Sequence, residues 1–312
     1  MTTIQTAIHL LSSNRLSIFI FHRVLPSQDP IFPDEPDAVR FDEMMGWIAS
    51  WFNVLPLDIA VDSLKSEKLP RRSAAITFDD GYADNHDVAL PILQHHGLPA
   101  TFFIATGFLD GGRMWNDTII ESLRHCKQPQ LDLSPLKLGC HDIISSEQKR
   151  GAIEAIIGQI KYRTIAERLE ITEQIAELAE VQPANNLMMT SQQVLAMKHA
   201  GMQIGAHTVS HPILARTDTR TARQEIAASK TRLESLLGQP VRTFAYPNGK
   251  PGSDYLPEHP EIVRELGFSL AVSTTWGVAR QSTDLFQLPR FTPWKKTRVG
   301  FAGQLAKNLF AG

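Results

Sequence analysis

The chain has 312 residues, of which 43% are hydrophobic, and a chain of this length and composition can bury a large core. Its 31 lysine and arginine residues nearly balance 33 aspartate and glutamate residues, and no basic patch or stripe is evident, so we expect no nucleic-acid partner. Cys126 and Cys140 are too few for a disulfide framework and are not spaced like zinc ligands.

The N-terminal residues lack the basic start and long apolar run of a secretory signal. The apolar run at residues 16–21 is far too short to span a bilayer, so we expect no transmembrane segment. These features predict a cytoplasmic protein, and loose attachment to a membrane assembly stays open. The sequence does not indicate an oligomeric state.

The first half of the chain alternates between strand and helix patterns. Short apolar, β-prone runs predict buried strands at residues 18–21, 74–78 and 100–105. Apolar positions at residues 84–94 predict a helix that closes near Gly97, and Pro91 inside it is expected to kink it.

The same alternation recurs in the second half. It predicts helices at residues 190–200, 220–237 and 262–266, and strands at residues 202–206, 241–246 and 268–273. Thr190 and Gln193 fit a capping box at the start of the first of these helices, and Gly238 stops the second.

Strands that alternate with helices indicate an α/β fold with a parallel sheet, and units repeated this often predict a closed (β/α) barrel. Residues from about 108 to 189 interrupt this rhythm. Within them, residues 147–181 are rich in Ala, Ile, Glu, Lys and Arg, which predicts partly exposed helices. We interpret the stretch as a helical insertion in a single catalytic domain that spans residues 1–312.

Two adjacent carboxylates end the second predicted strand, in the segment TFDDGY at residues 77–82. Neighbouring strand residues point to opposite sides, so Asp79 and Asp80 can serve different tasks at the strand end. Asp-Gly is also a common turn dipeptide. On this segment alone, the turn and the catalytic interpretations carry equal weight.

Two histidines follow a later strand, in the segment HTVSHP at residues 207–212. Histidines four residues apart can share one helical face and bind one metal ion. A single histidine at a strand end is more often structural, and a metal site here needs a third, oxygen-bearing ligand. The pair Asp79 and Asp80 offers one.

Together, a strand-ending Asp-Asp-Gly and a strand-ending His-x-x-x-His resemble the polysaccharide deacetylases, the NodB-like group also called carbohydrate esterase family 4. The resemblance runs over about residues 18–294 and implies an irregular (β/α) barrel of the NodB-homology type. It implies that Asp79 is the general base and that Asp80, His207 and His211 hold a divalent metal, usually zinc. Such a metal lowers the pKa of bound water and polarises the acetyl carbonyl.

A third motif of the family is altered in this chain. Many members carry Arg-Pro-Pro-Tyr-Gly, whereas residues 244–249 read FAYPNG, so Ala245 replaces the arginine that steadies the base. A backbone N–H near Asn248 can still act as an oxyanion donor, and the segment also fits a Pro-Asn-Gly turn. Tyr246 and Asn248 are candidate substrate contacts.

The late Leu-x-His segment of many members is absent, since residues 288–294 read LPRFTPW. Arg290 does not deprotonate near pH 7 and cannot be the general acid, but it can replace the arginine that orients the base. His22, directly after the first predicted strand, is the candidate acid. It resembles a branch of the family, including biofilm poly-N-acetylglucosamine deacetylases, with an N-terminal Tyr/Phe-His segment. The alternative is a hydrogen-bonded structural histidine.

Several aromatic side chains can stack on a sugar ring, although buried packing is the commoner role of such residues. The candidates are Tyr82, Trp115, Trp276, Phe291 and Trp294. Among them Trp276 and Trp294 follow predicted strand ends and are the better candidates.

The sequence therefore predicts metal-dependent N-deacetylation of a sugar in a polysaccharide, an oligosaccharide or a glycan precursor. A cytoplasmic location favours a precursor. The first alternative is an amidohydrolase of small cyclic amides or imides, whose relatives tend to lose the metal ligands. The second is a catalytically inactive carbohydrate-binding protein, which would lack Asp79 or a ligand. Neither loss has occurred in this chain.

Overall fold

The computed structural model describes residues 6, 8–9 and 12–310. In this part of the chain, parallel strands form one sheet in the order β1-β3-β4-β7-β8-β9-β10, with β2 beside β3, and β5 and β6 form a separate antiparallel hairpin. The strands are β1 (Ser17–Phe21), β2 (Asn53–Val54), β3 (Ser73–Phe78), β4 (Thr101–Ile104), β5 (Gln130–Asp132), β6 (Cys140–Asp142), β7 (Gln203–Ala206), β8 (Thr243–Ala245), β9 (Leu270–Trp276) and β10 (Leu288–Arg290).

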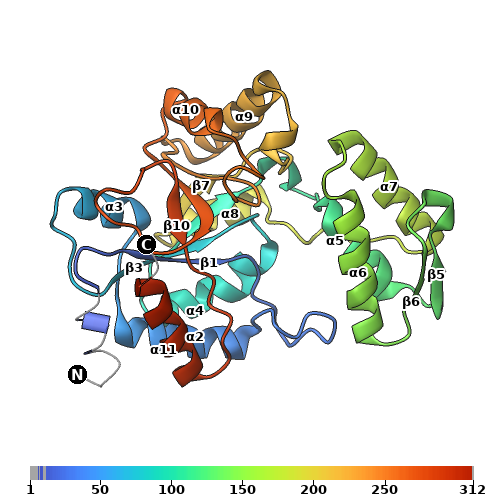
Figure 1. Cartoon of the computed structure of the whole chain (residues 1–312), viewed down its shortest axis with the longest axis horizontal. Helices are drawn as coiled ribbons and strands as arrows, with labels where there is room; N and C mark the ends of the chain where they lie inside the picture. Colours follow the sequence, from blue (N-terminus) through green and yellow to red (C-terminus); the bar gives the residue numbers. More distant parts are fainter. Residues whose placement is uncertain (1–5, 7, 10–11, 311–312) are drawn as a thin grey trace.

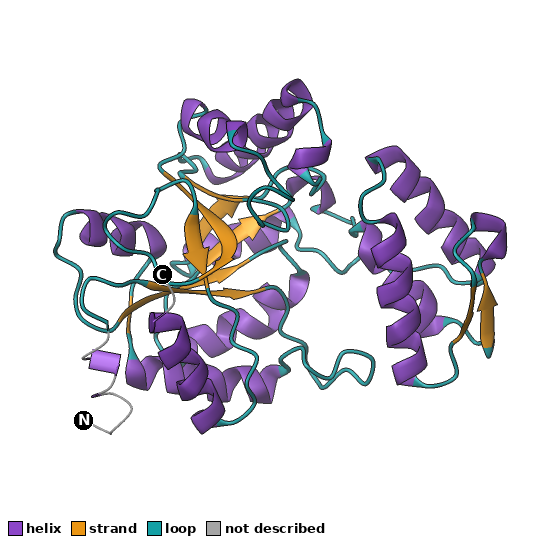
Figure 2. Cartoon of the chain, viewed as in Figure 1, coloured by secondary structure: helices purple, strands orange, loops and turns teal. Residues whose placement is uncertain are grey.

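The helices include α2 (Ala38–Trp51), α3 (Leu57–Lys65), α4 (Leu90–His95), α5 (Trp115–His125), α6 (Ser146–Ile160), α7 (Ile165–Leu178), α8 (Ser191–His199), α9 (Thr219–Leu237), α10 (Glu258–Glu265) and α11 (Arg298–Phe310). Most helices pack around this sheet, and α5, α6 and α7 form a separate group beside it, as Figures 1 and 2 show. Among the described residues, no helix has the length and apolar character needed to cross a membrane.

The sheet nearly closes on itself between its first and last strands. Phe291, just after β10, pairs in parallel with Phe19 of β1. The Phe291 N–H donates to the carbonyl of Ile18 at 2.7 Å, and the Ile20 N–H donates to the carbonyl of Phe291 at 3.0 Å. The predicted irregular (β/α) barrel is therefore confirmed.

Six barrel strands, β1, β3, β4, β7, β8 and β9, lie where the apolar runs predict them, whereas β2 and β10 were not predicted. All residues of β1 and β3 are buried, as expected for parallel strands covered on both faces. Aromatic rings fill part of the core, and the Phe78 and Phe102 rings stack with centroids 4.6 Å apart. The helix boundaries also follow their signals, because Thr190 and Gln193 form the predicted capping box of α8 and Gly238 ends α9 in a left-handed conformation.

The helix predicted at residues 84–94 differs in its first half. It begins as a π-helix, η1 (Asn85–Ala89), in which the Leu90 N–H donates to the carbonyl of Asn85, and it continues as α4. Pro91, in the first turn of α4, has no N–H to donate, and the wider turn before it absorbs this interruption. In place of the predicted kink, the helix changes from a π-helix to an α-helix just before Pro91.

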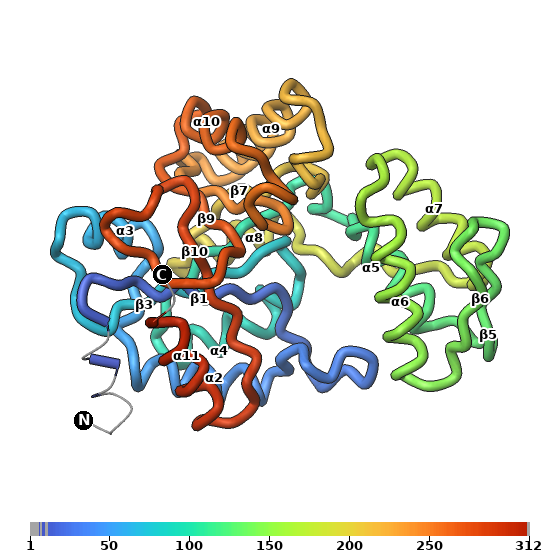
Figure 3. The backbone as a smooth tube through the Cα atoms, in the orientation of Figure 1, coloured from blue at the N-terminus to red at the C-terminus, as the bar shows by residue number. Residues whose placement is uncertain are grey.

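The elements between η2 (Thr106–Phe108) and α8 form a lobe beside the barrel, which we call the insertion lobe and which Figure 3 shows in green. It contains α5, α6, α7 and the hairpin of β5 and β6, which the sequence pattern did not reveal. The lobe has its own apolar cluster, built around Ile119, Ile153 and Ile175. The loop after β1 also joins it, since Asp29 accepts two hydrogen bonds from Arg124 of α5 at 2.9 and 2.6 Å.

Candidate active site

The predicted site residues meet at the carboxyl ends of the barrel strands, where parallel barrels place their catalytic groups. Strand pairing explains their proximity, because Phe21 pairs with Phe78 and Ile104 pairs with Ala206. These pairs align the strand ends that precede the site residues. Those residues are His22 after β1, Asp79 and Asp80 after β3, His207 after β7, Asn248 after β8, and Arg290 at the end of β10.

Asp80, His207 and His211 bring three ligand atoms together. The Nε2 atoms of both histidines lie 3.4 Å from Oδ1 of Asp80, and the ligand atoms of the three residues lie within 4.8 Å of one another. The histidine rings meet edge to face with centroids 4.8 Å apart. One carboxylate oxygen and two imidazole nitrogens form a donor set suited to a divalent transition metal.

Two observations show that these residues fit a metal ion. Oδ1 of Asp80 is buried and has no hydrogen-bond partner among the described residues, a costly arrangement unless a cation satisfies it. The Nδ1 atom of His207 lies 2.8 Å from the carbonyl of Ala245, so Nδ1 carries the proton and the Nε2 lone pair faces Asp80.

The pKa values of His211 and Asp80 agree with this arrangement. Burial lowers the pKa of His211 to about 3, so its imidazole is neutral at physiological pH. Burial also lowers the pKa of His207, but the neighbouring carboxylates outweigh burial and the net shift is upward. Burial raises the pKa of Asp80, yet the two histidines hold it well below its ordinary value. Asp80 is therefore ionised, as a ligand must be.

The two histidines do not share a helical face, contrary to the sequence interpretation. They lie in a loop after β7, with Thr208 and His211 in the left-handed region at φ 65° and 51°. Glu225 of α9 holds this loop, because its carboxylate accepts hydrogen bonds from the N–H groups of Val209 and Ser210, both at 2.8 Å, and from the Ser210 hydroxyl at 2.7 Å. The two histidines, four residues apart, are therefore brought together by the conformation of a loop and not by a helix.

Asp79 is held by Arg290 in a fully buried pair. The guanidinium donates to both carboxylate oxygens, at 2.7 and 2.6 Å, and its Nε donates to the carbonyl of Ser273 at 2.8 Å. Burial raises the pKa of Asp79, but the charge of Arg290 outweighs it and keeps the pKa below its ordinary value. Arg290 thus occupies the position of a residue that orients Asp79.

A cavity of about 240 Å³ opens onto these residues, and we call it the central cavity. The barrel supplies one part of its lining and the insertion lobe the other. The barrel side consists of His22, Asp79, Asp80, His207, His211, Asn248 and Thr274. The lobe side consists of Met114, Trp115, Asn116, Ile157, Lys161 and Arg168.

Asn248 adopts a left-handed conformation at φ 58° in the turn that follows β8. Its carbonyl accepts a hydrogen bond from the Thr274 hydroxyl at 2.8 Å. A side chain on Gly249 would lie 2.8 Å from Thr274, so only glycine lets the turn approach β9. The Asn248 N–H makes no hydrogen bond within the described residues and is free to donate.

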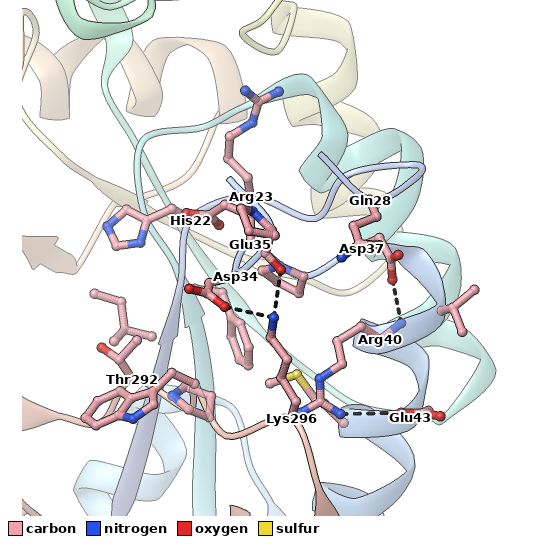
Figure 4. Close-up of a pocket in the computed structure, with 18 residues that line it drawn as sticks. His22, Arg23, Gln28, Asp34, Glu35, Asp37, Arg40, Glu43, Thr292 and Lys296 are labelled. Atoms are coloured by element: carbon pink, nitrogen blue, oxygen red, sulfur yellow. Dashed lines mark hydrogen bonds and ion pairs between the residues drawn. The ribbon is translucent and has the colours of Figure 1, made fainter. Parts of the chain in front are cut away.

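His22 lies at the junction of three cavities, and its exposed ring makes no hydrogen bond to any described residue. One of these cavities, of about 470 Å³, lies between the loop after β1 and the segment that precedes α11 (Figure 4). Asp34 and Lys296 form an ion pair at 2.8 Å in its lining. This cavity adjoins the central cavity through His22.

The structure does not bring every predicted substrate contact to the central cavity. Tyr246 is fully buried, stacks on Tyr255 with centroids 3.9 Å apart and donates to the carbonyl of Phe286, so it is not part of the central cavity lining. Tyr82 is buried as well and donates to Asp117 at 3.1 Å, in a neighbouring cavity. Both side chains pack within the protein.

The aromatic residues at the later strand ends are exposed, but they lie elsewhere. Trp276 and Trp294 are 36% and 52% exposed, with ring centroids 5.0 Å apart. They line a surface hollow with residues of α11 and are not part of the central cavity lining. Phe291 is fully buried beside Trp276. Only Trp115 of the aromatic candidates reaches the central cavity.

The residues that sequence reasoning missed at the site include Lys161, Arg168, Glu225 and Thr274. Lys161 and Arg168 belong to a stretch that reads as ordinary exposed helix, and no local pattern distinguishes them. Glu225 is one of several charged positions in α9. Thr274 follows the run predicted as a strand, and β9 extends past that run to Trp276. Strand-end position was the one signal that pointed to Thr274.

Residues 66–271 match the family model described as polysaccharide deacetylase. The match includes Asp79, Asp80 and both histidines, whereas His22 and Arg290 lie outside it. The chain is also 20% identical over 278 residues to YxkH of Bacillus subtilis (strain 168), a protein named after the same family. That similarity covers 88% of this chain and 70% of YxkH.

Solved deacetylase structures share the fold. Deacetylase PplD of Streptococcus pyogenes, solved with acetate, has a TM-score of 0.62 at 20% identity, over 95% of this chain and 98% of PplD. IcaB of Ammonifex degensii has a TM-score of 0.62 at 21% identity, over 95% and 97%. The BpsB deacetylase domain of Bordetella bronchiseptica has a TM-score of 0.56 at 16% identity, over 90% and 96%. On the family match, this chain belongs to the polysaccharide deacetylase family.

Proposed function

We propose that this chain removes the acetyl group from an N-acetylated sugar in a polysaccharide, an oligosaccharide or a glycan precursor. The reaction would use a divalent metal ion, for which zinc is the first candidate. The observation that carries the proposal is the buried cluster of Asp80, His207 and His211 beside an ionised Asp79 in one cavity. Such a constellation suits hydrolysis of an amide, which needs an activated water and a polarised carbonyl.

Asp80, His207 and His211 would hold the metal. When bound, the metal lowers the pKa of water and polarises the acetyl carbonyl. The chain prepares this site through its own contacts, since Ala245 fixes the tautomer of His207 and Glu225 fixes the loop that carries His211.

Asp79 would accept the proton of the attacking water. Its carboxylate is ionised because Arg290 lowers its pKa, and each oxygen keeps a lone pair beyond the one that faces the guanidinium. Arg290 also fixes the plane of the carboxylate. A base held in one orientation next to the cavity loses little entropy on reaching the transition state.

The remaining steps need an oxyanion donor and an acid. Asn248 lines the cavity, and its free N–H would donate to the oxyanion of the tetrahedral intermediate. His22 would protonate the departing amine, since its ring is exposed to the cavity and His207 and His211 are committed to the metal. Acetate and a free amino sugar are then the products.

The test is release of acetate and free amine from a panel of N-acetylated sugars, with added zinc and after chelation. Asp79→Asn should keep the metal and the fold but lower turnover by about 10²- to 10⁴-fold, because an amide cannot accept the proton. Asp87→Asn, at an exposed position outside the cavity, is the matched control and should keep wild-type turnover. Near wild-type turnover in Asp79→Asn would refute the assigned role of Asp79.

A further inference from the structure

The insertion lobe buries a cation without a counter-charge. Arg168 of α7 is 3% exposed, yet it forms no ion pair with any carboxylate of the described chain. Its Nε atom is buried without a hydrogen-bond partner. Arginine is almost never buried this deeply unless it is paired, so the position of Arg168 needs an explanation.

The protein contacts around Arg168 hold its position without balancing its charge. The guanidinium carbon lies 5.0 Å from the centroid of the Trp115 ring, and this contact orients the plane of the guanidinium. Burial lowers the pKa of Arg168, which shows that the surroundings disfavour its charged form. Selection for stability alone would favour an apolar side chain of similar size at this position.

Arg168 lines the central cavity together with Lys161, which follows α6. Lys161 is half-buried, and its ammonium group makes no ion pair among the described residues and lies 5.6 Å from the centroid of the Tyr162 ring. The carboxylates of the cavity lining are Asp79 and Asp80. Arg290 already pairs with Asp79, and Asp80 belongs to the metal cluster, so neither neutralises the lobe side.

We propose that Arg168 and Lys161 bind an oxyanion of the substrate, a phosphate or a carboxylate that is attached to the N-acetylated sugar. The planar guanidinium matches such a group in a two-point geometry, and the ligand supplies the missing counter-charge. The cavity, of about 240 Å³, is smaller than typical drug-sized sites and suits a single sugar unit. This inference deepens the proposed function, on which it rests for the acetamide part of the ligand.

A binding experiment tests the inference without requiring turnover. Calorimetry on the chelated protein, which keeps Asp79 paired with Arg290 and should not turn over, would compare N-acetylglucosamine 1-phosphate, N-acetylglucosaminuronic acid and the neutral methyl glycoside of N-acetylglucosamine. We expect at least one anionic sugar to bind about 10- to 100-fold more tightly than the neutral one, the scale of a charged hydrogen-bonded pair. Which anion is preferred distinguishes a phosphate from a carboxylate.

Substitution of Arg168 tests whether the insertion lobe causes the preference for anionic sugars. In the chelated protein, Arg168→Met keeps an apolar side chain on Trp115 but removes the charge, and it should abolish the advantage of the anionic sugar. Arg163→Met, at an exposed position close by on the same lobe and outside the cavity, is the matched control and should keep it. Equal affinity for all three sugars, or an advantage that survives Arg168→Met, would overturn the inference.

Thermal unfolding separates binding from a structural role. Removal of an unpaired buried charge should leave the unfolding temperature of Arg168→Met unchanged or higher than that of the parent protein, whereas loss of a structural contact would lower it. A protein that prefers anionic sugars but releases no acetate from any N-acetylated sugar would refute the proposed function and support this inference. Acetate release without a preference for anionic sugars would support the proposed function and refute this inference.

Discussion

The side chain of His22 differs in its surroundings from His207 and His211, the two histidines proposed as metal ligands. His207 and His211 face Asp80, and His207 also hydrogen-bonds the carbonyl of Ala245. The ring of His22 is exposed and makes no hydrogen bond to the described residues, although its backbone carbonyl accepts one from Asn85 at 2.8 Å. A histidine that merely closed β1 would be expected to use its ring nitrogens. A role in proton transfer fits better.

His22→Ala should therefore lower turnover on an N-acetylated sugar by about 10²- to 10⁴-fold and leave metal content little changed. Activated esters have leaving groups that need less protonation, so their hydrolysis should suffer less. Rates on both substrate types, measured with bound zinc, check this. His125→Ala, at an exposed position on the insertion lobe, is the control. Equal losses on amide and ester would point to a structural role for His22.

At the scale of elements, α9 fixes the loop that carries both histidines. Glu225 accepts three hydrogen bonds from Val209 and Ser210, and the loop contains two non-glycine residues in the left-handed region. Such conformations persist only where the surroundings impose them. The contact between a helix and a loop thus sets the positions of the two histidines proposed as metal ligands.

We expect Glu225→Ala to weaken zinc binding by about 10- to 100-fold, the usual effect of removing a group that orients metal ligands. The substituted residue contacts the loop backbone and not the ligand side chains, so the number of ligands stays the same. Competition with a zinc chelator measures the affinity. Gln224→Ala, exposed on the same turn, should bind zinc like the wild type, and a Glu225→Ala protein with unchanged affinity would contradict the expectation.

Helix α5 carries a buried carboxyl group, that of Asp117, whose protonation makes the stability of the fold depend on pH. Burial raises the pKa of Asp117 to about 7, whereas an aspartate in the unfolded chain titrates near pH 4. Between these values the folded chain holds a proton that the unfolded chain has lost. The contribution of Asp117 to stability therefore decreases as the pH rises from about 4 to about 7 and is constant above that.

Asp117→Asn removes this titration. The free energy of unfolding of the wild type should therefore decrease relative to that of the variant as the pH rises from about 4 to about 7. Urea unfolding in the presence of a chelator at several pH values between 4.5 and 8 measures it. Asp142→Asn, exposed on the same lobe, is the control. A difference that does not depend on pH would show that Asp117 is ionised throughout.

At the scale of the whole molecule, the central cavity exists only where the barrel and the insertion lobe meet. The barrel provides the predicted chemical groups, and the lobe provides the opposite wall and its two cations. The cluster of Asp80, His207 and His211 forms only when the strand ends of the barrel come together, so a metal bound there should stabilise the folded chain against unfolding by mass action.

Zinc in about 100-fold excess over its dissociation constant should raise the unfolding temperature by roughly 5–10 °C relative to chelated protein. His211→Ala should lose most of this shift. His96→Ala disrupts a second potential cluster, formed at the surface by Asp42, His95 and His96, and should keep the shift. Thermal scans with and without zinc test both variants, and a shift that disappears only in His96→Ala would place the metal at the surface cluster.

The sequence determined much of this protein through local signals. Buried strands are recognisable because both faces of a parallel strand must be apolar, which produces the runs at β1, β3 and β4. Helix ends are recognisable because caps satisfy backbone groups within a few residues, as Thr190 and Gly238 do. The family motifs at Asp79 and His207 stand out because each is contiguous and directly follows a strand.

The tertiary structure decided everything that depends on residues distant in the chain. The family resemblance offered Arg290 as the residue that orients the base, but only the closure of the barrel brings its guanidinium to Asp79 across 211 positions of the chain. The burial of Tyr246 follows from its stacking on Tyr255, which no local pattern reveals. Arg168 belongs to a helix that resembles any exposed helix in sequence, and only docking of the lobe places its charge in the cavity. Local propensity is a property of a few residues, whereas burial and charge pairing are properties of the assembled fold.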